Sequence, residues 1–200
     1  PDPDLTHRVT VMLMEVRERG AIYNMALERC TEQGFPFCIR FCYEQTMAEP
    51  TQIAEIVSLT ALTPHTTELV LRPIEHPIAF KPGQWISLQL PVGDHPPLNR
   101  AYSLAEPQTS TGCLTLVFDH VPGGKGSGYL ASLKRGDRIP LSGPYGHFVL
   151  PDLNSHNLLL VGRYSGLVPL RCMIRSLARQ DALPSTTLIA LAPSSAEQLY

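Results

Sequence analysis

Blocks of one charge sign and long apolar runs are both absent from this chain of 200 residues. Its formal net charge at pH 7 is −2, from 16 Lys and Arg against 18 Asp and Glu. Without a basic cluster we expect no nucleic-acid partner and no polybasic membrane anchor. Apolar runs such as Leu158–Val161 are far shorter than the roughly 20 residues of a membrane-spanning helix, and no signal peptide opens the chain. We therefore predict a soluble, cytoplasmic protein without a transmembrane segment.

Cysteine is sparse and unevenly placed. The five cysteines are Cys30, Cys38, Cys42, Cys113 and Cys172. An odd number in a chain of this size favours reduced thiols over a disulfide framework. The seven histidines lack the paired spacing of metal ligands, so we predict no metal site. No Gly-x-Ser-x-Gly element indicates a hydrolase.

The first 50 residues combine two patterns. His7–Val16 alternates between apolar and polar residues, which predicts a half-buried strand. From Ile22 to Cys30 apolar residues recur at helical spacing, and Gly34 is suited to end a helix. We therefore expect a small α+β segment over residues 1–50.

The rest of the chain divides where the spacing of its apolar residues changes from that of strands alone to that of strands and a helix. Residues 51–150 contain short strands separated by Pro and Gly turns, a pattern typical of an antiparallel barrel. Residues 151–200 predict a strand at Leu158–Val161, a helix at Pro169–Arg179 and a strand at Thr187–Ala192. Such a βαβ unit is expected to be parallel and right-handed.

Several motifs follow one another within the barrel segment. They are FKPGQW at 80–85, NRAYSL at 99–104, PGGKGSGYL at 122–130 and SGPYGHF at 142–148. An isolated Arg-x-Tyr-Ser is typical of an ordinary strand, and a lone Gly-Gly of a hairpin turn. Together and in this order, however, the motifs resemble those of the ferredoxin reductase family of flavoproteins, in particular the reductase components of bacterial oxygenases. The resemblance covers roughly residues 52–200.

This resemblance implies a flavin site on the strand that carries Arg-x-Tyr-Ser. Tyr102 would lie against the isoalloxazine ring and Ser103 near its redox-active nitrogen, which makes these two the predicted catalytic residues. Leu104 would also contact the cofactor, and Arg100 would pair with phosphate through its fork of donors. The implied cofactor is FAD, with FMN as an alternative.

The glycine-rich turn would hold the pyrophosphate of the cofactor. Glycine lets the backbone N–H groups approach a phosphate closely, and a hydroxyl adds one more donor. The residues implied are Gly123, Gly124, Lys125, Gly126 and Ser127. Many relatives carry a basic residue on the preceding strand where this chain has Asp119. Either this carboxylate faces away from the phosphate or flavin affinity is reduced.

The loop after the strand at 158–161 departs from the resemblance. Relatives usually read Gly-Gly-Thr-Gly, whereas this chain reads Arg163-Tyr164-Ser165-Gly166. Ser165 and Gly166 keep the frame and are predicted to bind cofactor. Arg163 could contact a pyrophosphate, or Tyr164 could fill the cleft or cover the flavin.

No arginine stands at Ser194 or Ser195 to bind a 2′-phosphate, and the strands that complete the nicotinamide site do not follow. NAD(P)H binding is thus in question, and we expect an open sheet edge that a partner chain covers.

Oxygenase reductases often begin with a ferredoxin whose two-iron cluster is held by Cys-x4-Cys-x2-Cys and a distant cysteine. Here the spacing is Cys38-x3-Cys42, with no fourth cysteine before Cys113. We interpret residues 1–50 as a degenerate or shortened ferredoxin-like segment without an intact 2Fe–2S cluster.

We therefore predict three parts: the segment 1–50, a six-stranded antiparallel flavin-binding β barrel over 51–150, and a partial Rossmann-like α/β unit over 151–200. The predicted function is FAD-dependent electron transfer from NAD(P)H to an oxygenase or iron–sulfur partner protein. The alternative is a non-catalytic, reductase-like accessory or regulatory subunit that has lost nicotinamide and cluster binding.

Overall fold

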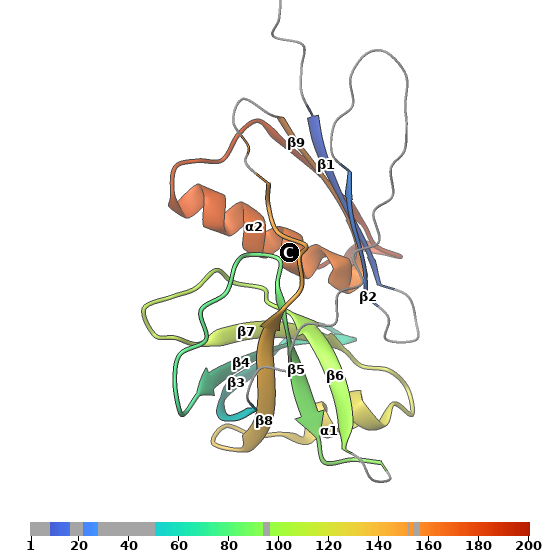
Figure 1. Ribbon diagram of the computed structural model, residues 1–200. Helices are drawn as coiled ribbons and strands as arrows, with labels where there is room; N and C mark the ends of the chain where they lie inside the picture. The colour runs from blue at the N-terminus through green and yellow to red at the C-terminus, as the bar shows by residue number, and fades with distance from the viewer. Residues whose placement is uncertain (1–8, 17–21, 28–50, 94–96, 152, 154–156) are drawn as a thin grey trace, which may run out of the picture.

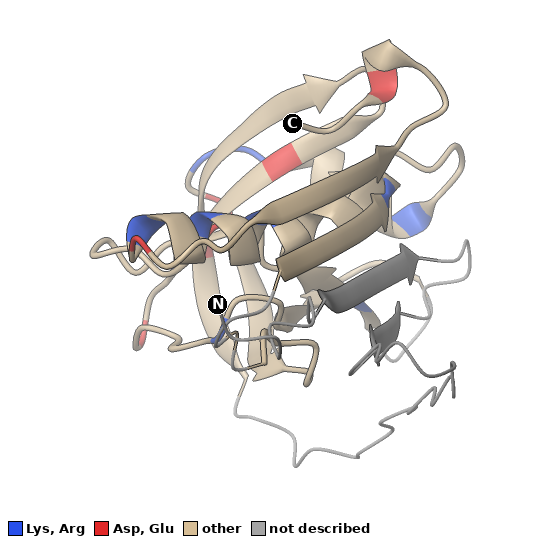
Figure 2. Ribbon diagram, turned by 90° about the horizontal axis from the view of Figure 1, so that it is seen from above, with Lys and Arg blue, Asp and Glu red and all other residues tan. Residues whose placement is uncertain are grey.

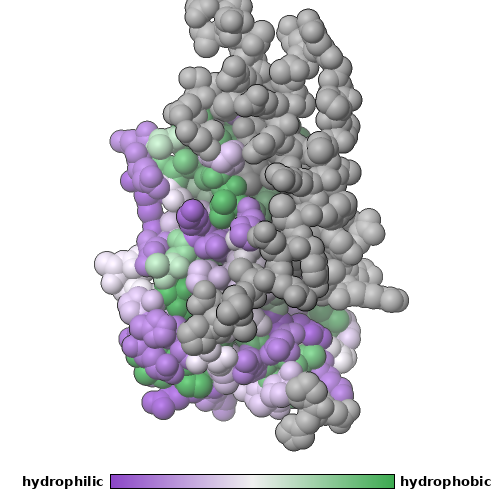
Figure 3. Space-filling model, viewed as in Figure 1, coloured by the Kyte–Doolittle hydropathy of each residue, from purple (hydrophilic) through white to green (hydrophobic). Residues whose placement is uncertain are grey.

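The structure is a computed structural model, shown in Figure 1. It describes residues 9–16, 22–27, 51–93, 97–151, 153 and 157–200. A six-stranded barrel occupies one end of the molecule and a four-stranded sheet the other, with helix α2 between them. On the face seen in Figure 3, hydrophilic and hydrophobic residues are interspersed over the barrel.

The barrel consists of antiparallel strands in the order β6-β5-β8-β3-β4-β7. Their bounds are β3 (Gln52–Thr63), β4 (Thr66–Pro73), β5 (Trp85–Leu90), β6 (Leu98–Ser103), β7 (Leu114–Asp119) and β8 (Arg138–Tyr145). The edge strands β6 and β7 meet where Leu104 forms a bridge with Leu116, and the Ala105 N–H donates to the Thr115 carbonyl at 2.7 Å. The sheet is thereby closed, and the predicted six-stranded antiparallel barrel is confirmed.

Apolar side chains at every second position of the strands fill the barrel interior. On β5, Ile86, Leu88 and Leu90 are fully buried, whereas the residues between them are partly exposed. This period of two is what a strand with one face toward a core requires. The other large side chains that are fully buried in this core are Ile56, Leu69, Leu71, Leu104, Leu114, Leu116, Phe118, Leu130, Ile139 and Leu141.

Helix α1 (Lys125–Ser132) follows the glycine-rich turn and was not predicted. Two glycines within KGSGYLAS disfavour a helix by propensity. Packing outweighs this preference, because Leu130 is fully buried in the barrel core and Gly126 is buried against β5 and β6.

The predicted βαβ unit is confirmed. Strands β9 (Asn157–Arg163) and β10 (Thr186–Leu191) are parallel, and the 3₁₀ turn η1 (Tyr164–Gly166) leads into α2 (Leu167–Arg179). A second 3₁₀ turn, η2, spans Ser195–Glu197. Helix α2 begins two residues earlier than predicted, which is possible because Pro169 lies in its first turn, where backbone N–H groups have no partner within the helix.

Two sides of α2 hold the parts together. Leu170 and Met173 pack with Leu158 and Leu160 of β9 and with Phe148. Val168 instead packs with Ala105 and Val117 of the barrel. The apolar contacts at the start of the helix therefore help to fix the position of α2 relative to the barrel.

Strands β1 (Val9–Val16) and β2 (Ile22–Leu27) complete the second sheet, in the order β10-β9-β1-β2. The strand predicted at His7–Val16 is confirmed over residues 9–16. The helix predicted from Ile22 is wrong over Ile22–Leu27, because antiparallel pairing with β1 outweighs the helical spacing of the apolar residues.

One sheet edge expected to be open is paired within the chain. Strand β1 lies parallel to β9, from Val9 opposite Asn157 to Met14 opposite Gly162. Strand β10 remains at an edge of this sheet.

Cys30, Cys38 and Cys42, on which the ferredoxin interpretation depends, lie outside the described residues. Within the described ranges no helix is long and apolar enough to cross a membrane.

Candidate functional site

Strand β6 presents Arg100, Tyr102 and Ser103 at the edge of the barrel sheet. They lie opposite Leu88, Ile86 and Trp85 of β5, respectively. Arg100 is exposed, and its Nη1 donates to the neighbouring Asn99 carbonyl at 2.9 Å. The Tyr102 ring packs partly buried against the barrel core, and Ser103 is half-buried. The strand therefore offers a guanidinium, an aromatic ring and a hydroxyl along one short edge.

Leu104 differs from the other predicted cofactor ligands. Its side chain is fully buried in the barrel core. Its backbone N–H donates to the Gln84 carbonyl at 3.1 Å. The side chain thus supports β6 from within the core.

The glycine-rich turn lies against Arg100. Gly123 has φ +70°, and a Cβ on Gly124 would lie 2.8 Å from Ser127 Oγ, so the turn requires residues without side chains. A Cβ on Gly126 would lie 3.7 Å from Arg100 Cγ. The structure therefore brings the beginning of α1 and the Arg100 side chain together, as predicted from their separate motifs.

This corner favours an anion. The free N–H groups of a helix N-terminus carry partial positive charge, and the first turn of α1 contains no acidic residue to neutralise it. Lys125 is exposed at the same place. Ser127 was predicted to donate to pyrophosphate, but its hydroxyl bonds within the turn: Oγ accepts from the Val121 N–H at 3.1 Å and lies 3.3 Å from the Val121 carbonyl. It holds the turn closed.

Asp119 lies at the end of β7, near the tyrosine. Its Oδ1 accepts a hydrogen bond from Thr66 Oγ1 at 3.0 Å. The pKa of Tyr102 is raised from 10.0 to about 12, chiefly by burial; Arg100 opposes this shift and Asp119 adds to it. The charge of Asp119 therefore acts on the aromatic part of the site.

Replacing Tyr102 by phenylalanine is expected to make the free energy of unfolding fall less steeply as the pH rises above 10. The folded-state pKa lies above the unfolded value of 10.0. The neutral phenol thus contributes stability that is fully present below pH 10 and is lost as the pH rises toward 12. Urea titrations at several pH values between 9 and about 12 would measure this slope. Equal slopes for Tyr102→Phe and the wild type would contradict the assignment.

The loop between β9 and α2 turns its two large side chains toward each other. Arg163 Nη2 donates to Tyr164 Oη at 3.0 Å, and the guanidinium carbon lies 4.5 Å from the ring centroid. Tyr164 has φ 51°, a conformation that glycine adopts with less strain. Ser165 is half-buried, and Gly166 is buried at the start of α2.

Tyr164 lines a cavity of about 280 Å³ between this loop and the barrel. The other lining residues are Thr63, His65, Thr66, Asp119, Glu197 and Leu199. Tyr164 therefore lies beside the barrel, at the wall of this cleft. A larger cavity, about 500 Å³, lies near Lys81, Gln84 and His147, and none of the predicted site residues lines it.

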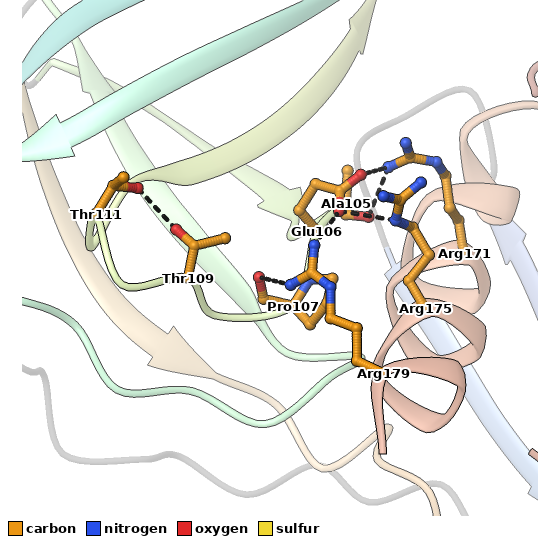
Figure 4. Close-up of polar contacts among 8 residues, drawn as sticks. All are labelled: Ala105, Glu106, Pro107, Thr109, Thr111, Arg171, Arg175 and Arg179. Carbon is orange, nitrogen blue, oxygen red and sulfur yellow. Dashed lines mark hydrogen bonds and ion pairs between the residues drawn. The ribbon is translucent and has the colours of Figure 1, made fainter. Parts of the chain in front are cut away.

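Sequence reasoning missed a cluster of charges beside this site. Glu106, three residues after Ser103, forms ion pairs with Arg171, Arg175 and Arg179 of α2 (Figure 4). The spacing of the arginines by four residues indicates one helix face, but nothing in the sequence names their partner. Among the described residues, no group of three His, Cys, Asp or Glu side chains could hold a metal ion.

Comparison with known proteins decides what the barrel is. A model described as an oxidoreductase FAD-binding domain matches residues 54–150. The barrel belongs to this FAD-binding family. The motifs of β6 and of the glycine-rich turn therefore lie inside the matched FAD-binding domain, and the predicted family and its cofactor FAD are confirmed.

Curated relatives of the FAD-binding domain include reductase components of bacterial oxygenases. The chain is 31% identical over 137 residues to the terephthalate 1,2-dioxygenase reductase component 2 of Comamonas sp, covering 68% of this chain and 40% of that protein. It is 33% identical over 143 residues to the phenol 2-monooxygenase reductase component DmpP of Pseudomonas sp. strain CF600, covering 71% and 39%. The chain thus spans about 40% of the length of these relatives.

A solved structure shows the same arrangement. The Amycolatopsis cytochrome P450 reductase GcoB has a TM-score of 0.64 to this chain and 27% sequence identity, covering 80% of this chain and 47% of its own. The likeness therefore covers a longer stretch than residues 54–150.

Proposed function

We propose that this chain takes electrons from NAD(P)H and passes them through FAD to an oxygenase or iron–sulfur protein. The observation that carries the proposal is the contact between Arg100 and the start of α1 within the FAD-binding domain. The relatives that are reductase components of oxygenases support the choice of partner.

The corner of Arg100 and α1 fits the phosphates of FAD. Two phosphates need charge compensation and several donors at short range. Arg100 supplies a guanidinium, and the first turn of α1 supplies backbone N–H groups that no side chain caps. The absence of side chains at Gly124 and Gly126 lets a phosphate approach the backbone there.

Tyr102 and Ser103 would hold the reactive ring. The half-buried Tyr102 offers a flat surface beside the core, and its phenol is neutral at physiological pH, as an ordinary tyrosine is. The Ser103 hydroxyl would supply a hydrogen bond to the ring. When bound, FAD supplies the exchange between two-electron and one-electron transfer; the protein supplies position and electrostatics.

Tyr164 would control access of the nicotinamide. Its side chain lines the cleft between the β9–α2 loop and the barrel, held by Arg163. We infer that a hydride donor approaches the flavin on the side of the barrel that α2 contacts. We infer that Tyr164 slows nicotinamide entry and moves with Arg163 when a donor binds.

Anaerobic titration of the purified, FAD-loaded chain with NADH tests the proposal. Bleaching of the visible flavin band is expected. A flavin that stays oxidised would support the accessory subunit without hydride access, and failure to retain any flavin would contradict both interpretations.

A double variant, Arg163→Gly with Tyr164→Gly, is expected to raise the rate of flavin reduction by about tenfold or more, because both bulky side chains leave the cleft. Arg135→Gly, an exposed arginine outside this cleft, serves as the matched control. An unchanged rate in the double variant would show that Tyr164 does not limit access. Stopped-flow absorbance would measure all three rates.

A further inference from the structure

Glu106 occupies a position between the flavin-binding strand and helix α2. It follows Ser103 by three residues, just beyond β6, and its side chain is 19% exposed. Its carboxylate pairs with Arg171, with Arg175 Nε at 2.9 Å and with Arg179 Nη2 at 3.3 Å. One acidic side chain thus contacts three successive turns of the same helix, as Figure 4 shows. We call Glu106 and these three arginines the Glu106 clamp.

The same arginines also bind the backbone on either side of Glu106. Arg171 Nη1 donates to the Ala105 carbonyl at 3.0 Å, and Arg179 Nη1 donates to the Pro107 carbonyl at 3.3 Å. Residues 105–107 are therefore held through both side chain and main chain. Contacts of this kind define orientation as well as distance, because a guanidinium donates within its plane.

The arginines depend on Glu106 for charge compensation. Figure 2 shows basic residues as separate blue bands along the helix. Residues four apart on a helix are neighbours, so three guanidinium groups at 171, 175 and 179 repel one another unless an anion lies between them. A glutamine at position 106 keeps the shape but removes that anion. Its effect should therefore exceed the loss of a single exposed ion pair.

The Glu106 clamp connects the two parts of the candidate site. On the barrel side it begins three residues after Ser103. On the other side it holds α2, whose first residue directly follows η1, the turn that contains Tyr164. The small apolar contact of Ala105, Val117 and Val168 lies between these points. Movement of α2 against residues 105–107 would change the spacing between Ser103 and Tyr164.

We propose that Glu106 is a positioning residue that, through the arginines of α2, sets the spacing between Ser103 and the Tyr164 loop for hydride transfer. The proposal rests on the function proposed above. Glu106 acts through α2 and touches neither cofactor nor donor.

Glu106→Gln in the FAD-loaded chain tests this role, with Glu55→Gln as the matched control. Glu55 pairs with Arg72 at 2.9 Å between β3 and β4, away from α2. Two readouts are needed: amide hydrogen exchange across residues 167–179, and the rate of flavin reduction at saturating NADH. Glu106→Gln is expected to retain FAD, to exchange faster in α2 and to reduce flavin about tenfold more slowly, with both rates unchanged in Glu55→Gln.

Arg175→Gln provides a second, milder variant, since its side chain is 48% exposed and two arginines remain. It should shift both readouts in the same direction by less. If amide hydrogen exchange in α2 is as slow in Glu106→Gln as in the wild type, the clamp is overturned. If exchange is faster in the variant but flavin is reduced at the wild-type rate, the positioning role is overturned. A wild-type chain that binds no FAD, or does not react with NADH, overturns the proposed function and the catalytic half of this proposal; the exchange data still decide the clamp.

Discussion

Gly83→Ala is expected to lower the free energy of unfolding by about 4 kcal/mol or more, because strain and overlap coincide there. Gly83 has φ +101°, and a Cβ at this position would lie 1.9 Å from the Phe148 carbonyl oxygen and 2.4 Å from Met173 Cε. The first neighbour is backbone and cannot rotate away. The FKPGQW loop would have to move away from the segment that contains Phe148 and from α2. Urea unfolding followed by fluorescence would measure the loss.

Gly93→Ala separates the two contributions. Gly93 has nearly the same backbone angle, φ +94°, but a Cβ on this residue would meet nothing within 4 Å. Only backbone strain remains, so the expected cost is about 1 kcal/mol. Equal losses for the two variants would mean that the contact of Gly83 with Phe148 and Met173 is not tight.

Arg100→Ala is expected to weaken FAD binding by about 10- to 100-fold, the range for losing a charged hydrogen-bond donor to a phosphate. The rest of the corner would remain, because Gly126 and its turn are held by contacts within the turn and with Leu90 and Leu98. Fluorescence titration of the apoprotein with FAD would give the two dissociation constants.

Arg72→Ala is the matched control for Arg100. Arg72 is also an exposed arginine on a barrel strand, but it pairs with Glu55 on the far strands β3 and β4. Its loss should leave FAD affinity within about twofold, since exposed ion pairs contribute little and distant charges are screened. A similar weakening in both variants would indicate a general effect of net charge rather than a phosphate contact at Arg100.

The barrel could be predicted because its signals are local. Alternation such as that of Ile86, Leu88 and Leu90 needs only a window of six residues, and Pro and Gly mark where each strand ends. The FKPGQW loop and the Arg-x-Tyr-Ser of β6 were recognisable for the same reason, because each motif is a short continuous run of the sequence.

The errors arose where distant partners decide the structure. The apolar spacing after Ile22 indicates a helix, yet pairing with β1 makes this segment a strand. Helix α1 escaped prediction because packing of Leu130 and Gly126 outweighs its weak propensity. Glu106 and Arg179 are 73 residues apart, and their pairing exists only once α2 docks on the barrel. Leu104 stays a predicted cofactor contact, with its side chain buried in the barrel core.

The parallel pairing of β1 with β9 has a consequence for how the chain folds. Val9 lies opposite Asn157, so the loop that this pairing closes contains the whole barrel sequence. Closing so long a loop in an extended chain is entropically costly and slow. A barrel that has already folded brings the two ends near each other and removes most of that cost. We therefore expect the barrel to form first and the four-stranded sheet last, during synthesis as well as in refolding.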